Sequence, residues 1–76
     1  MNSRAGVAAE IRAAMARKGI NQTTLAEQIT MSRASLSDGL RGRRAFDTDE
    51  LEEIGQVVEV DPIVFLLAGG VVAAAG

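Results

Sequence analysis

The chain contains no cysteine and no histidine, so the side chains most often used for metal ligation and proton transfer are missing. Carboxylates crowd together between Asp47 and Glu53, without a glycine-rich phosphate cradle beside them. Acids at the start of a helix complement the helix dipole, and this explains the cluster better than an acid/base pair does. We therefore expect no enzyme activity, no metal site and no cofactor.

The basic side chains are distributed unevenly. All eight Lys and Arg lie within residues 1–44 beside three acids, which gives that segment a net charge of +5. Residues 45–76 carry seven acids and no base, a net charge of −7. One half of the molecule could meet a polyanion while the other half faces away. The same charge distribution would arise if opposite charges only solvated opposite faces of a small helical bundle. Sequence motifs are therefore needed to distinguish the two explanations.

Length and composition indicate one small folded domain. The chain has 76 residues, of which 47% are hydrophobic and 24% charged. Two phenylalanines are its only aromatic residues, so the core must consist mainly of aliphatic side chains, which favours helices over a sheet. The longest apolar run, residues 63–76, falls short of the roughly 20 residues of a membrane span. We expect no membrane association and no signal peptide, and a cytoplasmic location.

Capping residues and apolar spacing predict five helices. Val7, Ile11 and Met15 recur every four residues, which indicates a helix from Arg4 to Lys18 with Ser3 as its cap. Gly19 ends that helix. The remaining four begin after good N-cap residues, and the last has proline at its first position. They are expected from Asn21 to Ile29, from Ser32 to Leu40 or Gly42, from Asp47 with Glu50 as a capping box through Val58, and from Asp61-Pro62 through Ala68.

Two short helices joined by a tight turn, over residues 22–42, resemble the helix-turn-helix of the phage-repressor and Cro family. The resemblance extends from Ile11 to Leu67. It rests on Gln22, Leu25-Ala26, Ser32-Arg33, Leu36 and Arg41-Gly42. It implies an all-α fold, a compact five-helix lambda-repressor-like domain over residues 1–69 with a short tail at 70–76.

The resemblance also implies where DNA would be contacted. The helix that begins at Ser32 would enter the major groove and direct its first residues to base edges. Arg33 would bind guanine through a bidentate pair of hydrogen bonds, and Ala34 would touch a thymine methyl group. Ser37 and Asp38 would contact bases one turn later, although Asp38 could equally be a cap or an ion-pair partner. The residues expected at the DNA backbone are Asn21, Gln22, Ser32, Arg41, Arg43, Arg44, Arg17 and Lys18.

Two positions depart from the family pattern. Thr30 occupies the turn position where the family usually has glycine, which predicts a different turn geometry because a β-branched residue disfavours positive φ. Gly39 replaces an apolar residue late in the second helix of the motif. Glycine costs roughly 1 kcal/mol of helix propensity relative to alanine, so we expect this helix to fray or end early.

The C-terminal region is predicted to form a dimer interface. Apolar side chains surround the whole helix from Ile63 to Leu67, more than one buried face requires. The interface residues are predicted to be Val64, Phe65, Leu67, Val71 and Val72. The alternatives are that the first helix and the tail cover both sides of this helix within the monomer, or that the tail is disordered.

These features predict a sequence-specific transcriptional regulator, such as a Cro or immunity repressor. It would bind a double-stranded DNA operator as a homodimer and act by occupancy, in the cytoplasm of a bacterial host at the nucleoid. The alternative is an antitoxin-like or adaptor module, which would bind a protein and for which DNA would be secondary.

Overall fold

The computed structural model describes residues 3–69, which form five α-helices in the predicted order. The helices are α1 (Ser3–Lys18), α2 (Gln22–Gln28), α3 (Arg33–Leu40), α4 (Thr48–Val58) and α5 (Pro62–Ala68). The all-α, five-helix prediction is therefore confirmed. The predicted tail at residues 70–76 lies outside the described residues, so the domain boundary at residue 69 stays a prediction.

The predicted caps explain why the helices begin where they do. The side chains of Asn21 and Ser32 accept hydrogen bonds from the backbone N–H groups of Thr24 (2.8 Å) and Ser35 (3.1 Å). Both halves of the predicted capping box of α4 form, and Asp61 caps α5 ahead of Pro62. Each cap satisfies backbone donors that a helix leaves unpaired at its first turn.

The helix ends follow local chemistry as well. Gly19 ends α1 at φ 75°, a conformation that glycine adopts without strain. The predicted early end of α3 at Gly39 is wrong, because the helix continues through Leu40. Thr30 does not adopt positive φ. Among residues 3–69, Glu59 at the end of α4 is the non-glycine residue with positive φ, so Thr30 avoids that region.

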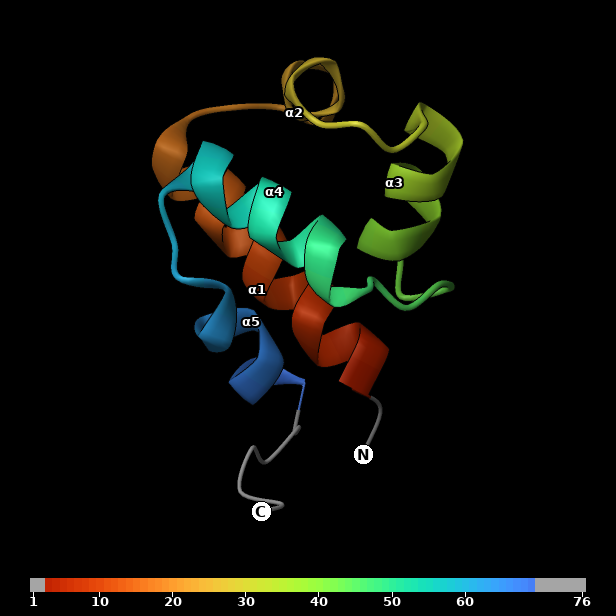
Figure 1. Ribbon diagram of the computed structural model, residues 1–76, viewed down its shortest axis with the longest axis vertical. Helices are drawn as coiled ribbons and strands as arrows, with labels where there is room; N and C mark the ends of the chain where they lie inside the picture. The colour runs from red at the N-terminus through yellow and green to blue at the C-terminus, as the bar shows by residue number, and fades with distance from the viewer. Residues whose placement is uncertain (1–2, 70–76) are drawn as a thin grey trace.

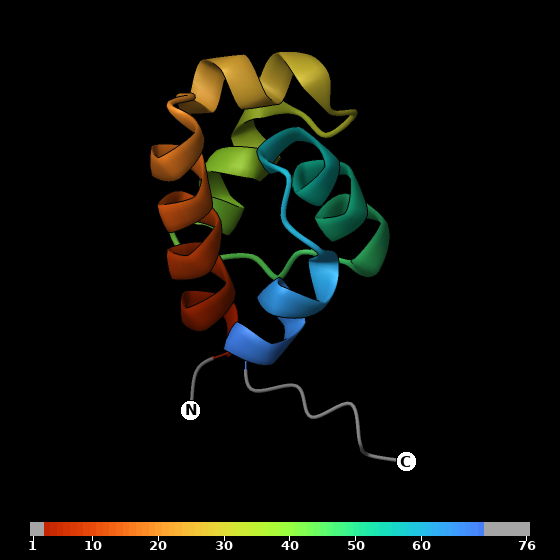
Figure 2. The same ribbon diagram turned by 90° about the vertical axis from the view of Figure 1, so that its left-hand side faces the viewer.

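The core lies between α1, α4 and α5, with α2 and α3 closing one end. Figure 1 shows α4 in front of α1, with α3 on one side of them and α5 on the other. Figure 2 shows α2 lying across the end opposite the two termini. The largest fully buried side chains come from all five helices: Ile11, Leu25, Leu36, Leu51, Ile54 and Phe65. Burial of each contributes about 1.5–3 kcal/mol, and together they fix the motif against the rest of the domain.

Candidate nucleic-acid interface

The outer face of α3 carries the residues expected to read bases. Arg33 and Ala34, in its first turn, are exposed, whereas Ser37 and Asp38, one turn later, are half-buried. The side chain of Ser32 is occupied as the helix cap, as predicted. Arg33 and Arg41 stand eight positions apart, about 12 Å along the helix axis. The first turn of α3 is thus free to contact a ligand.

The eight basic side chains separate into groups by their partners. Three are in ion pairs: Arg17 with Glu10 (3.7 Å), Lys18 with Glu59, and Arg44 with Glu50 (2.7 Å). Two donate to backbone carbonyl oxygens: Arg12 to Leu40 of α3, and Arg4 to Arg43 after α3. Within residues 3–69, no hydrogen bond or ion pair engages the side chains of the remaining three, Arg33, Arg41 and Arg43.

The three unengaged arginines all lie on α3 or directly after it. Their donors therefore point to solvent from one continuous stretch of chain, Arg33 to Arg43. The predicted contacts Arg17, Lys18 and Arg44 differ from these, because each would have to leave a carboxylate before it could bind phosphate. Surface ion pairs are weak, about 0–1 kcal/mol, so Arg17 and Lys18 can exchange partners at little cost.

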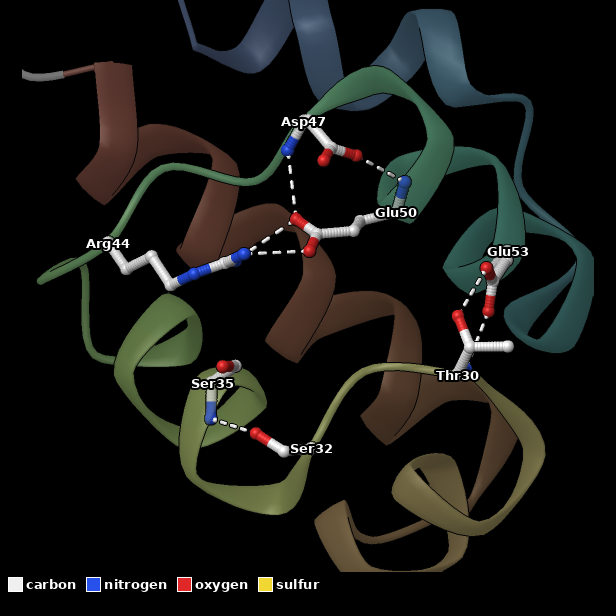
Figure 3. A network of polar contacts seen from close by, with 7 residues as sticks. All are labelled: Thr30, Ser32, Ser35, Arg44, Asp47, Glu50 and Glu53. Carbon is white, nitrogen blue, oxygen red and sulfur yellow. Dashed lines mark hydrogen bonds and ion pairs between the residues drawn. The ribbon is translucent and has the colours of Figure 1, made fainter.

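The Arg44–Glu50 pair is more strongly built than the other two. The two guanidinium nitrogens of Arg44 donate to the two carboxylate oxygens of Glu50 at 3.0 and 2.7 Å, as Figure 3 shows. The same carboxylate accepts the N–H of Asp47 at 3.0 Å in the capping box. The hydrogen bonds from Arg44 hold the pKa of Glu50 below its ordinary value. Those bonds, with the charges of Glu50, Asp47 and Asp38, raise the pKa of Arg44.

Asp38 is half-buried on the second turn of α3, and its charge contributes to the raised pKa of Arg44. Within residues 3–69, Asp38 forms no ion pair, so the ion-pair role predicted for it is not seen. Base reading by Asp38 stays a prediction.

The start of α2 is also open. Asn21 and Gln22 are both exposed, next to the exposed end of α1. The side-chain oxygen of Asn21 serves as the cap of α2, which leaves its amide nitrogen free of that role. Both residues therefore have polar groups on the surface, and their contact with a DNA backbone stays a prediction.

Sequence analysis missed the contacts that hold α3 in place from outside the motif. Arg12 of α1 donates to the carbonyl of Leu40, at the C-terminal end of α3, and Arg4 donates to the carbonyl of Arg43 at 3.2 Å. A cation at a helix C-terminus is stabilising. Arg4 and Arg12 are eight residues apart, which puts both on one face of α1. This spacing is the feature of the sequence from which a shared role could have been predicted.

The turn between α2 and α3 is tied to α4. Thr30 donates from its backbone N–H (2.7 Å) and from its hydroxyl (2.8 Å) to the two carboxylate oxygens of Glu53. Figure 3 shows this contact on the far side of α4 from Arg44. The threonine that replaces the usual glycine therefore supplies an anchor, since a glycine has no hydroxyl for the second bond. No local signal in the sequence reports a partner 23 residues away.

The predicted dimer residues are only partly exposed. Leu67 is 59% and Val64 38% exposed, and Ile63 beside them is 41% exposed. Phe65 was wrongly assigned to the interface, because its side chain is fully buried in the core and has no surface to offer. The spacing of the apolar residues turns Phe65 inward while its neighbours turn out. Val71 and Val72 lie outside the described residues.

Other ligand chemistries find little support in the same part of the chain. Among residues 3–69, no three acidic side chains come together as metal ligands. None of the five helices has the length and apolarity that crossing a membrane requires.

Comparison with known families agrees with this geometry. A family described as Helix-turn-helix matches residues 11–65, from the middle of α1 into α5. The matched range includes the whole of α2, α3 and α4 and most of the buried core. Searches of curated proteins and of solved structures each returned no match.

Proposed function

The chain belongs to the XRE-type helix-turn-helix family of DNA-binding transcriptional regulators, and we propose that it is a repressor of the Cro or immunity-repressor kind. It would recognise a double-stranded operator with α3 in the major groove and block transcription by occupying that site. The observation that carries the proposal is the placement of the three unengaged arginines, Arg33, Arg41 and Arg43, on α3 and its exit.

We assign different roles in DNA binding to these three arginines. Arg33, in the first turn of α3, would read a guanine with Ala34 and Ser37 beside it. Arg41 and Arg43 follow the helix and would bind phosphates, which supplies affinity without sequence information. Asn21 and Gln22 would bind the backbone from the start of α2, in the way that backbone contacts set the register of such domains.

The proposal includes a homodimer. One domain of this size contacts few base pairs, so sequence-specific binding needs two half-sites about 34–36 Å apart. Val64 and Leu67 stand three positions apart on the outside of α5 and are the exposed apolar side chains that support this interface. Because α3 and α5 lie apart in both views, dimer contacts through α5 would leave α3 uncovered.

Selection from a randomised duplex pool tests the proposal. The full chain is incubated with the pool at near-physiological salt, and the retained DNA is sequenced. An enriched inverted repeat with a fixed spacing supports a dimeric, sequence-specific regulator. A single enriched half-site would refute the dimer and would still support sequence-specific DNA binding. Retention without enrichment, lost as salt rises, would refute the repressor and favour the protein-binding alternative.

A further inference from the structure

Arg44 is the one predicted DNA contact that is held in a bidentate ion pair. Its Nη1 and Nη2 atoms donate to the two carboxylate oxygens of Glu50 at 3.0 and 2.7 Å. An arginine binds a carboxylate and a phosphate with the same kind of parallel donor pair. Glu50 therefore occupies the end-on donor pair of Arg44, one of those that a DNA phosphate would use.

Glu50 is held in that position by its own helix. Its carboxylate accepts the N–H of Asp47, and its N–H donates to the side chain of Asp47 at 2.8 Å. Its side chain is only 16% exposed, against 36% for Arg44. The carboxylate is thus the fixed partner and the arginine the more mobile one. When the pair opens, Arg44 leaves and Glu50 stays.

We propose that Glu50 is an intramolecular competitor of DNA phosphate for Arg44, and that it lowers the affinity of the domain for duplex DNA of any sequence. The inference rests on the proposed function, since it concerns the same DNA-binding surface. The exposed donors of Arg41 and Arg43 bind phosphate first, and Arg44 adds its contact only when it is released. Because a phosphate contact carries no sequence information, this competition lowers the affinity for operator and for other duplex DNA alike.

The matched variants are Glu50→Gln and Glu52→Gln. Glutamine serves at this position of a capping box, so Glu50→Gln removes the ion pair and keeps the helix start. Glu52 lies two residues further along α4, is exposed and forms no ion pair within residues 3–69. Glu52→Gln therefore makes the same change in net charge without releasing an arginine. Arg44→Ala is made in the wild-type chain and in the Glu50→Gln chain.

Binding of a fluorescent duplex of arbitrary sequence is measured by anisotropy at several salt concentrations. One extra phosphate contact steepens the slope of log K against log salt by about 0.9. The affinity gain of Glu50→Gln over wild type should then be about 3.5-fold larger at about 50 mM salt than at about 200 mM. Arg44→Ala should abolish this gain in the Glu50→Gln chain and change the wild-type slope little. Glu52→Gln should leave the slope unchanged.

Equal slopes for wild type and Glu50→Gln would overturn the inference and leave the proposed function standing. A wild-type slope that falls by about 0.9 in Arg44→Ala would also overturn it, because Arg44 would then be on the DNA despite Glu50. Failure of both the wild-type and the Glu50→Gln chain to bind duplex at the lowest salt would overturn both proposals. Circular dichroism spectra that coincide for all variants confirm that the fold is retained.

Discussion

Replacing Gly39 by alanine should destabilise the domain, although alanine is the better helix former. A Cβ atom at position 39 would lie 2.3 Å from Cζ and 2.7 Å from each Cε of the Phe46 ring. Carbon atoms in contact prefer separations of about 3.5–4.0 Å, so the ring would have to retreat by more than about 1 Å. Phe46 is half-buried and packs against the core, so a displaced ring would lose part of that packing.

The two opposing effects can be compared. Alanine in place of glycine gains about 1 kcal/mol of helix propensity. Forcing an extra methyl group into packed surroundings costs about 1–3 kcal/mol. We therefore expect Gly39→Ala to lower the free energy of unfolding by about 0–2 kcal/mol. The result should reverse in a Phe46→Ala chain, where the ring is gone and the propensity term of about 1 kcal/mol acts alone.

Urea unfolding followed by far-UV circular dichroism measures all four chains of this cycle. Ala13→Gly serves as the reference for the glycine–alanine difference, because Ala13 is exposed in the middle of α1. It should cost about 1 kcal/mol. The reasoning is refuted if Gly39→Ala raises the unfolding free energy as much in the wild-type chain as in the Phe46→Ala chain. In that case, the contact between Gly39 and Phe46 would carry no energy.

Three further predictions concern binding, pH and assembly. Arg33→Ala should weaken binding to a selected operator about 5- to 150-fold and leave affinity for random duplex nearly unchanged, as titrations on both DNAs would show; an equal loss on both would make Arg33 a phosphate contact. Because Arg44 holds the pKa of Glu50 below 4.5, ionised Glu50 stabilises the fold above that pH, and this stability is lost as pH falls through the lowered pKa. The difference in unfolding free energy between wild type and Glu50→Gln should therefore shrink in acid, and a difference that stays constant from pH 7 to the acid region would contradict the assignment. Leu67→Lys should convert a dimer to a monomer in analytical ultracentrifugation with α3 unaffected, whereas an unchanged mass would exclude α5 as the interface.

Local signals were sufficient to predict the helices. Asn21, Ser32, Asp47 and Asp61 each cap a helix through a bond to a residue two or three positions away. Such a bond can be inferred from a few neighbouring residues, so the order and approximate bounds of the helices followed from the sequence. The helix-turn-helix was found in the same way, because its determinants lie within about twenty consecutive residues.

Predictions that depended on distant contacts failed or were incomplete. Gly39 was expected to weaken α3, but it is the residue type that leaves room for the Phe46 ring. Phe65 was assigned to the surface because a helix that is apolar all round does not show which side is buried. The ring is in the core because α1 and α4 both pack on that side of α5. Neither fact can be inferred from spacing along one helix.

The ion pairs of the folded domain change the interpretation of the charge asymmetry along the chain. Counted by segment, the bases and acids divide between the first and second halves, which suggests two separate charged regions. In the folded domain, the acids Glu50 and Glu59 of the second half bind Arg44 and Lys18 of the first. The acids therefore neutralise Lys18 and Arg44, which are not on the outer face of α3. On that face, Arg33 has no carboxylate partner among residues 3–69. A chain with a net charge of −2 can in this way keep a local positive surface, since a field within about 8–10 Å depends on unpaired charges more than on the total.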